Sequence, residues 1–382
     1  FIDILRHEHE ISIIFPENGK NTMPSMRQLQ ALWPEVKFFP YSYMKQMTNP
    51  EFAITQAIRA FNLKFRKEAL DFKVERILKP YGFDLSDKFV RFVEKVLKDI
   101  QADIMQIDFY PFLGLAKMIK TDVKKLFIHH EIRYMRNKRM LSQLGLNAED
   151  IPLYNRIKEQ EINDLNTYDA VVTLTDIDSA ILANEGVTTT IKTSPAAIST
   201  NIQKVCNWNN VFAFVGSASH GPNQEGISWF TNEVLPLIDW KKYQHCTFDL
   251  VGRGWDNTQF EYPQTLEVSI TGFVENLADI LLGSIMVVPI LSGSGMRMKI
   301  LEGAALGLPI ITTTVGMEGL TFKPGRDCLV ADTAEEFAMC MERLFTDQQE
   351  RMRLANNAQE IFRKHYSRKR MAEIRGGIYN KL

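Results

Sequence analysis

The sequence predicts an α/β protein of two domains, each with a parallel sheet covered by helices. The chain has 382 residues, which exceeds the length at which a single hydrophobic core stops growing. In its second half, short apolar runs rich in Val and Ile, bounded by Gly or Pro, alternate with helical stretches. Such runs are typical of parallel strands that are buried on both faces.

The second half carries the clearer signal. The sequence predicts strands at 211–216, 247–252, 268–272, 285–290 and 308–313, and helices at 223–237 and 296–306. After Ala334 it is helical almost to Leu382. This alternation predicts a Rossmann-like domain.

The first half shows the same rhythm with less regularity. Strands are predicted at 10–15, 104–107, 125–129 and 170–174, and a charged, mostly helical insertion occupies 52–99. Residues 1–7 have the pattern of the last turns of an amphipathic helix, which in such a domain normally follows a strand and a loop. We therefore expect that strand and loop to be absent from this numbering; a native start with a short helix is the alternative.

A break in the pattern at 194–209 predicts the domain boundary. The predicted domains are an acceptor-side domain at 1–200 and a donor-binding domain at 201–364, with a helix at 365–382 that packs back on the first domain.

Composition excludes several classes of protein. The net charge of −1 gives no overall basicity that calls for nucleic acid as a partner. The four cysteines lie far apart without a Cys-x-x-Cys pair, which argues against a zinc site and a disulfide framework and favours a reducing, cytoplasmic location. No apolar run reaches the roughly 18–20 residues of a membrane-spanning helix.

The segment 289–313 has the strongest functional signal. It reads as a strand, a Gly-Ser-Gly turn and a helix from about Met296 that Gly307 ends. Gly293 and Gly295, on either side of Ser294, allow positive φ angles and a close approach of the backbone. The turn therefore directs N–H groups and a positive helix end toward one place, which favours an anion such as phosphate.

Two cations and a carboxylate follow the turn. Arg297 and Lys299 are unfavourable at a helix N-terminus by roughly 0.3–1 kcal/mol each, so an anionic ligand is expected to compensate. Glu302 lies one turn further on the same helical face as Lys299, where it can accept the hydroxyls of a ribose. The alternative is an ordinary glycine turn followed by a Lys299–Glu302 surface pair.

These residues resemble the donor-binding signature of the family 4 retaining glycosyltransferases, which have the GT-B fold of two facing Rossmann-like domains. The resemblance continues through VGSASHGPNQEG, FDLVGRGW, ITGFVENLADIL and GRDCLVAD. It implies that Gly216 and Ser217 bind the donor, and that the backbone at Phe273 and Val274 reads the donor base. No cofactor is implied other than the nucleoside-diphosphate sugar, which is the donor substrate.

The resemblance also assigns roles within the segment. Glu302 matches the second glutamate of the family's paired motif, whereas Ser294 replaces the first, which implies altered recognition of the sugar. Gly293, Gly295 and Met296 would bind the diphosphate, and Arg297 and Lys299 would neutralise it. In the first domain, IHHEIRYMR resembles the family's histidine motif. His130 would contact the transferred sugar, while His129 is expected to face the opposite side of the strand and to pack.

The implied activity is transfer of a sugar, with retention of configuration, to an acceptor hydroxyl in polysaccharide or glycolipid assembly. No Asp-x-Asp follows an apolar strand, since 176–178 reads as a helix start, so no metal requirement is expected. The alternatives are an inactive sugar-nucleotide-binding subunit and a nucleotide-sugar epimerase. A phosphorylase and an NAD-type dehydrogenase are disfavoured because a pyridoxal-type lysine context and a Gly-x-Gly-x-x-Gly turn are both missing.

The stretch 59–139 has 19 Lys and Arg against 11 Asp and Glu. One interpretation is a cationic face that contacts anionic lipid and meets a lipid-linked acceptor. The other is an ordinary helix surface whose apolar side packs in the core.

Overall fold

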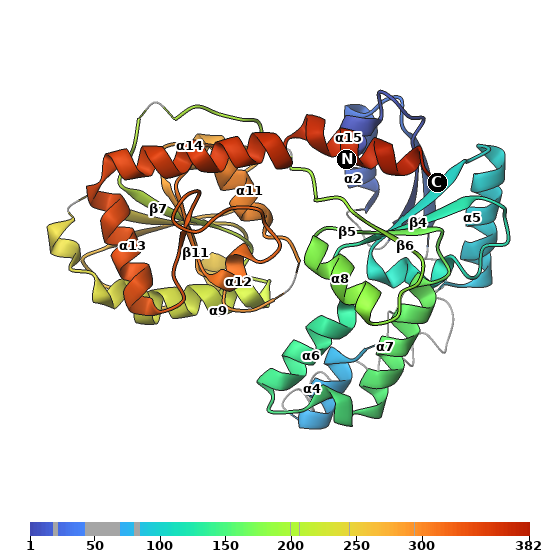
Figure 1. The fold of residues 1–382 in the computed structure, drawn as a ribbon, viewed down its shortest axis with the longest axis horizontal. Helices are drawn as coiled ribbons and strands as arrows, with labels where there is room; N and C mark the ends of the chain where they lie inside the picture. The colour runs from blue at the N-terminus through green and yellow to red at the C-terminus, as the bar shows by residue number, and fades with distance from the viewer. Residues whose placement is uncertain are drawn as a thin grey trace. The chain divides into compact units, whose positions relative to one another are not determined.

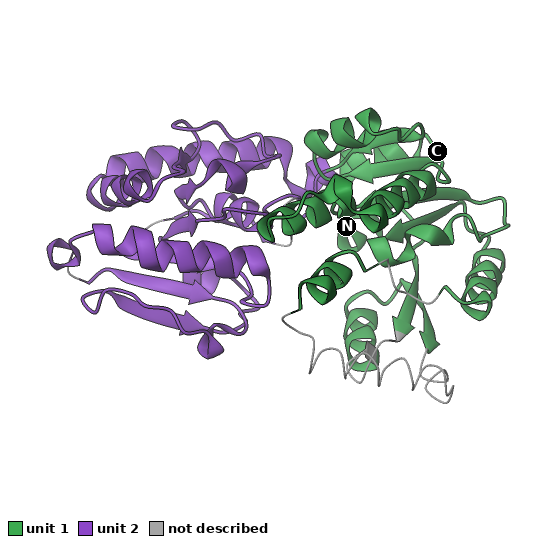
Figure 2. Cartoon of the chain, turned by 90° about the horizontal axis from the view of Figure 1, so that it is seen from below, with its two compact units in different colours: residues 1–194, 372–382 green, residues 195–371 purple. Residues whose placement is uncertain are grey.

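The computed structural model describes residues 1–17, 22–42, 69–79, 85–198, 200–205, 207–243, 245–293 and 295–382. The chain divides into two compact units, unit 1 (Phe1–Ser194 with Ala372–Leu382) and unit 2 (Pro195–Met371), which Figure 2 shows in green and purple. Each unit has its own hydrophobic core. Most of the predicted insertion at 52–99 lies outside the described residues.

Unit 1 contains two parallel sheets. The larger has the order β3-β4-β5-β6, and β1 pairs with β2 in the smaller. Their bounds are β1 Ser12–Glu17, β2 Lys37–Ser42, β3 Ile104–Asp108, β4 Lys124–His129, β5 Ala170–Thr173 and β6 Thr190–Thr193. The four strands predicted for this half are confirmed within a few residues. β2 and β6 were not predicted.

The helices of unit 1 pack their apolar sides into its core. They are α1 Ile2–Leu5, α2 Thr22–Leu32, α4 Leu70–Ile77, α5 Asp87–Asp99, α6 Arg133–Gln143, α7 Pro152–Leu165 and α8 Asp176–Asn184. Helix α5 is strongly amphipathic, and Phe89, Val93 and Leu97 are buried. Its apolar side therefore packs in the core, as the second interpretation of this segment requires. Thr175 caps α8, so the start of a helix predicted at 176–178 is confirmed.

Unit 2 has one parallel sheet of six strands in the order β12-β11-β10-β7-β8-β9. The strands are β7 Val211–Val215, β8 Thr247–Val251, β9 Glu267–Thr271, β10 Ile285–Val288, β11 Ile310–Thr312 and β12 Leu329–Val330. Strand order reverses between β7 and β10, since the chain builds outward from β7 in one direction and then from β10 in the other. This is the doubly wound arrangement.

Helices cover both faces of this sheet, with α11 and α14 on one side and α9 on the other (Figure 1). They are α9 Gly221–Trp229, α10 Ala278–Leu281, α11 Met298–Ala305, α12 Thr314–Met317, α13 Ala334–Thr346 and α14 Gln348–His365. Helix α9 continues as a π-helix, Phe230–Val234, and a 3-10 turn, Leu235–Leu237. The helical segment predicted at 223–237 is thus present, with an earlier start and a change of helix type.

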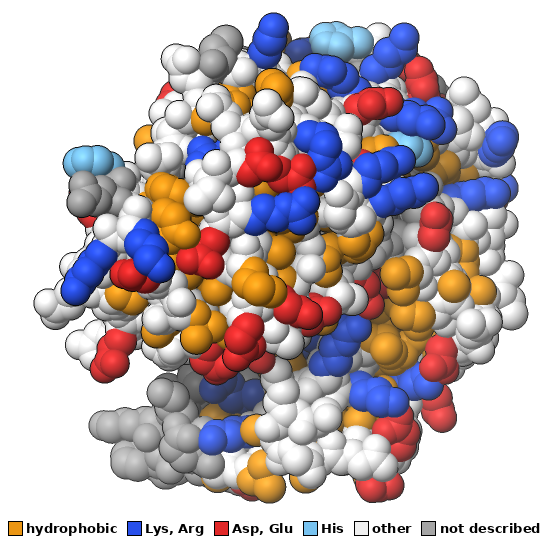
Figure 3. All heavy atoms as spheres, turned by 60° about the vertical axis from the view of Figure 1, so that its left-hand side comes forward, with side chains coloured by type: hydrophobic (Ala, Val, Ile, Leu, Met, Phe, Trp, Pro, Cys, Tyr) orange, Lys and Arg blue, Asp and Glu red, His pale blue; other side chains and the backbone are white. Residues whose placement is uncertain are grey.

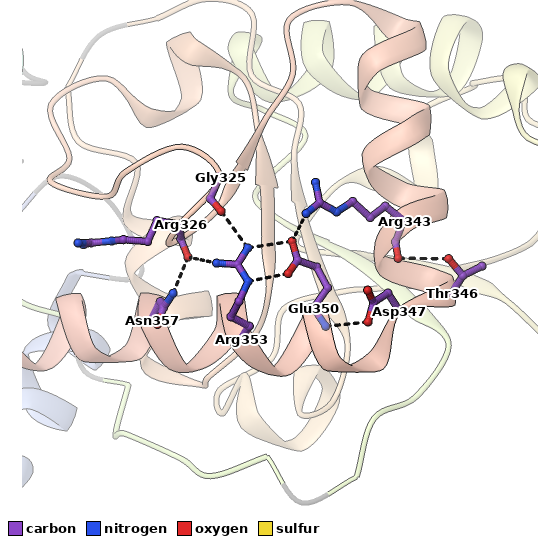
Figure 4. Close-up of polar contacts among 8 residues, drawn as sticks. All are labelled: Gly325, Arg326, Arg343, Thr346, Asp347, Glu350, Arg353 and Asn357. Carbon is purple, nitrogen blue, oxygen red and sulfur yellow. Dashed lines mark hydrogen bonds and ion pairs between the residues drawn. The ribbon is translucent and has the colours of Figure 1, made fainter.

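The corner between α13 and α14 is held by an ion-pair cluster (Figure 4). Asp347 caps α14, and Glu350 in the first turn pairs with Arg343 and Arg353. Arg353 also donates to the carbonyl oxygen of Gly325 at 2.9 Å. The cluster therefore fastens the loop before β12 to α14.

Helix α15, Arg368–Tyr379, begins in unit 2 and ends in unit 1. On the face drawn in Figure 3, basic and acidic side chains are intermixed, in keeping with the net charge of −1. Among the helices that the structure describes, none combines the length and the apolar character needed to span a bilayer.

Candidate active site

The loops at the carboxyl ends of β7 and β10 meet where the strand order of unit 2 reverses. In doubly wound sheets this position is where ligands bind. Two close approaches join the loops. A Cβ at Gly226 of α9 would lie 2.1 Å from the carbonyl oxygen of Pro289, and one at Gly293 would lie 3.1 Å from Cγ of Pro222. These glycines bring the start of α9 against the loop after β10.

The first loop begins with Gly216 and Ser217, directly after β7. A Cβ at Gly216 would lie 2.5 Å from Nδ2 of Asn223 and 3.1 Å from Nζ of Lys299, so glycine leaves room for these two polar groups. Asn223 is buried and donates through Nδ2 to the carbonyl oxygen of Ser217 at 2.9 Å. This bond holds the Asn223 amide with Oδ1 directed toward Lys299, which follows the loop after β10.

Lys299, in the first turn of α11, links the segment after β10 to the segment after β7 through its bond to Asn223. Its ammonium donates to Oδ1 of Asn223 at 2.8 Å and lies 4.0 Å from the ring centroid of Phe214. Burial, assisted by the nearby charge of Arg297, lowers the pKa of Lys299 from its ordinary 10.5 to about 7. Asn223 and Phe214 are both neutral, so the site contains a cation that is favourably oriented but not neutralised by an ion pair.

The turn before Lys299 has the predicted backbone conformation. The φ angles of Gly293 and Gly295 are 101° and 80°, and Gly307 ends α11 with a φ of 69°, which confirms the three glycine predictions. Ser294 lies outside the described residues. Helix α11 begins at Met298, two residues after the start predicted near Met296. The cause is the backbone of the N-cap residue Arg297, whose φ of −85° and ψ of 88° are not helical.

Arg297 is almost fully buried and stabilises the turn from within. Its Nη1 donates to the carbonyl oxygen of Gly295 at 2.6 Å. Met296 packs partly buried against the core of unit 2. The guanidinium therefore places a positive charge directly beneath the turn while satisfying one of its carbonyl groups.

Glu302 lies one helical turn beyond Lys299 and is partly buried. Burial raises the pKa of its carboxyl group, and the charge of Lys299 opposes that shift. Both side chains are described, and no ion pair joins them. The alternative of a Lys299–Glu302 surface pair is therefore wrong, because Lys299 bonds to Asn223 instead.

The loop after β9 presents an exposed aromatic ring. Phe273 is 64% exposed, and the guanidinium of Arg253 lies 4.5 Å from its ring centroid. Val274 packs partly buried against the core. Arg253 follows β8, so the loops after β8 and β9 add a cation and a flat apolar surface to the carboxyl edge of the sheet.

His130 lies in unit 1, just beyond the end of β4. Its Nε2 is 3.2 Å from Oδ1 of Asp108, which ends β3, and its ring stacks on Phe109 with centroids 4.6 Å apart. His130 is partly exposed. His129 is 1% exposed and faces the other way, with Nε2 3.1 Å from Glu161, so the prediction that it packs is confirmed.

Four of these residues were not among the predicted site residues. Asn223 and Phe214 act through contacts between segments far apart in the sequence, which no local pattern reports. Arg253 and Asp108 could have been found, because each is the polar residue directly after a predicted apolar strand, and such a residue lies at the ligand-binding edge of the sheet. Among the described residues, no group of three His, Cys, Asp or Glu is suited to hold a metal ion.

Comparison with known proteins bears on the fold and on the second unit. Residues 209–347 match the sequence model of the family described as Glycosyl transferases group 1. No curated protein matches the sequence. Solved structures similar to this chain include HepE from Anabaena in complex with UDP and glucose, at 12% identity and a TM-score of 0.64, with 100% of this chain and 95% of that chain covered.

A glycosyltransferase from Rickettsia africae is similar at 13% identity and a TM-score of 0.61, with 100% of this chain and 93% of that chain covered. TarM is similar at 13% identity and a TM-score of 0.57, with 76% of this chain covered, and the match spans 58% of TarM. The chain therefore has the GT-B fold with two Rossmann-like domains, and its second unit matches a group 1 glycosyl transferase domain.

Proposed function

We propose that the protein is a retaining glycosyltransferase, which moves a sugar from a nucleoside-diphosphate donor to an acceptor hydroxyl without a metal. The observation that carries the proposal is the pair of loops at the switch point of unit 2. There Lys299, Arg297 and the positive-φ turn at Gly293 and Gly295 gather positive charge. The match to group 1 glycosyl transferases over 209–347 and the GT-B fold support it.

The reaction requires stabilisation of developing charge, which these groups can supply. When the bond between the sugar and the diphosphate breaks, negative charge develops on the leaving oxygen and positive charge on the ring. Lys299 and the turn amides are proposed to stabilise the leaving group, and the anionic diphosphate is proposed to favour the protonated form of Lys299, which burial alone disfavours. Gly216 and Ser217 complete the diphosphate site. Glu302 is proposed to accept the ribose hydroxyls.

The loop at Phe273 and Val274 is proposed to receive the donor base, next to Arg253. His130 is proposed to contact the transferred sugar from unit 1. The acceptor is proposed to be a saccharide or lipid-linked hydroxyl in polysaccharide or glycolipid assembly, and the protein to be cytoplasmic.

Binding and turnover together test the function. A panel of UDP-, GDP- and ADP-sugars should raise the melting temperature for one base, because ligand at about 100 times Kd stabilises by roughly 2.7 kcal/mol. Release of the nucleoside diphosphate in the absence of acceptor should follow for the same donor. Stabilisation without release would favour the sugar-nucleotide-binding subunit, and no stabilisation by any donor would contradict the proposal.

Peripheral membrane contact through unit 1 is a separate proposal. With the apolar side of α5 buried, the contact must use its exposed cations Lys88, Arg91, Lys95 and Lys98. Flotation with vesicles of anionic lipid should retain the protein, and vesicles of neutral lipid should not. Equal recovery with both would contradict the proposal.

A further inference from the structure

A chain of polar side chains in unit 1 connects helix α15 to His130. The hydroxyl of Tyr379 of α15 lies 2.6 Å from Oε1 of Gln106, Nε2 of Gln106 lies 2.8 Å from Oδ2 of Asp108, and Oδ1 of Asp108 lies 3.2 Å from Nε2 of His130. We refer to these four residues as the His130 relay.

The strand geometry explains why the relay can form. Gln106 and Asp108 are two residues apart in β3 and so project from the same face of the sheet. Asp108 ends β3 and pairs in register with Ile128 of the neighbouring strand, so His130 follows at the same edge. Residues Ala372–Leu382 belong to unit 1, which makes the relay part of a single compact unit.

The chemistry of each group fixes the direction of every hydrogen bond. An ionised carboxylate only accepts, so both Nε2 of His130 and the amide nitrogen of Gln106 must donate to Asp108. Oε1 of Gln106 is then left to accept from the hydroxyl of Tyr379. No two donors or two acceptors face each other.

We infer that Asp108, Gln106 and Tyr379 are positioning residues that hold His130 as the tautomer protonated on Nε2. His130 then presents Nδ1 as a hydrogen-bond acceptor, which can receive a hydroxyl hydrogen of a bound sugar. The ring is also held by stacking on Phe109, whose φ of 71° is a strained backbone conformation for a residue with a side chain. The surrounding structure thus holds Phe109 in a strained conformation, and stacking on its ring keeps the imidazole of His130 in one plane.

Arg375, one helical turn before Tyr379, is buried beside the relay, whereas Gln106 within the relay is exposed. Arg375 is 1% exposed, and it contacts the ring of Phe1 at 4.2 Å and Oγ of Ser194 at 3.3 Å. Burial of the charge lowers the pKa of this guanidinium group, an effect that the tyrosine and Asp108 oppose. A buried arginine without a carboxylate in direct contact costs stability, and Tyr379 and Asp108 of the relay offset part of that cost because both favour the charged guanidinium.

The inference rests on the proposed function for the role of His130, but its first test does not. In the full chain, the long-range correlation spectrum of ¹⁵N-labelled histidines distinguishes the two neutral tautomers, and His130→Asn assigns the signal of His130. We expect the Nε2-protonated form in the wild type at pH 8. Tyr379→Phe and Asp108→Asn should both give a mixture of tautomers. An unchanged tautomer in both variants, or the Nδ1-protonated form in the wild type, would overturn the relay.

Tyr168→Phe is the matched control. Tyr168 is a buried tyrosine of the same unit whose hydroxyl donates to the carbonyl oxygen of Leu113 at 2.6 Å, outside the relay. Its removal should cost similar stability and leave the tautomer of His130 unchanged.

The kinetic test uses donor hydrolysis or transfer. Asp108→Asn is expected to lower kcat by about tenfold to hundredfold, as is typical when the partner that orients a functional histidine is removed, with little change in KM for the donor. Tyr379→Phe should lower kcat less, and Tyr168→Phe should not lower it. A tautomer shift without a change in kcat would overturn the catalytic role of the relay, whereas absence of turnover in the wild type would instead refute the proposed function.

Discussion

Lys299→Met is expected to lower kcat by about 10²–10³, because it removes a positively charged donor from the position where the leaving diphosphate gains charge. Methionine keeps an unbranched side chain one atom shorter than lysine, but it has no ammonium to place over the ring of Phe214 or to donate to Asn223. The measurement is release of the nucleoside diphosphate under saturating donor. Wild-type kcat in the variant would contradict the role of Lys299.

Two comparisons separate catalysis from stability for this variant. Glu302→Ala should mainly raise KM for the donor, because a ribose contact is made in the ground state as well as in the transition state.

The second comparison is of the free energy of unfolding at different pH values. The pKa of Lys299 is lowered to about 7 in the folded protein, so between about pH 7 and pH 10.5 the unfolded chain binds more protons.

Stability should therefore rise with pH across that window, by at most about 1.4 kcal/mol per pH unit from this group. Lys299→Met should remove this contribution and be more stable than the wild type at pH 7 in the absence of ligand. The check is the difference between wild type and variant in urea unfolding at pH 7 and pH 9.

Gly226→Ala is expected to destabilise unit 2 by about 1–3 kcal/mol or more. The new Cβ would lie 2.1 Å from the carbonyl oxygen of Pro289, a backbone atom that cannot rotate away. Helix α9 or the loop after β10 must then shift, and that loop leads into the turn at Gly293 and Gly295. Donor affinity should fall together with stability, as measured by urea unfolding and by the thermal shift with the preferred donor.

Gly221→Ala provides the control in the same helix. A Cβ at Gly221 meets nothing within 4 Å. Gly221 is the first residue of α9 and precedes Pro222, so alanine gains less there than the roughly 1 kcal/mol by which it is favoured over glycine in a helix interior. This variant should be as stable as the wild type or slightly more so, with unchanged donor affinity. Equal destabilisation by both substitutions would show that the contact with Pro289 is not the cause.

The sequence predicted what local backbone chemistry decides. The turn at Gly293 and Gly295 and the helix stop at Gly307 follow from residue type alone. Strand β6, Thr190–Thr193, was missed because this short edge strand has alternating exposed side chains and no apolar run. Strand β2 was missed because Pro40 interrupts its pattern, which is tolerated in a two-stranded sheet.

The candidate site shows the same contrast between features that local sequence predicts and features that depend on tertiary packing. The predicted residues of the turn carry the cations, but the group that orients Lys299 is Asn223, 76 positions earlier. Gln106 and Tyr379 are 273 positions apart in the chain and meet only through the fold of unit 1. Such pairs depend on tertiary packing, and a single sequence contains no periodicity that reveals them.

Burial of Lys299, together with the nearby charge of Arg297, also gives the site a distinctive reactivity. An amine with a pKa near 7 is in part unprotonated at physiological pH, and an unprotonated amine is a nucleophile. Pyridoxal phosphate, an aldehyde that carries a phosphate, is therefore suited to form an imine with this lysine, and an occupied donor site should protect it. Covalent labelling thus offers a way to follow occupancy of the pocket before any acceptor has been identified.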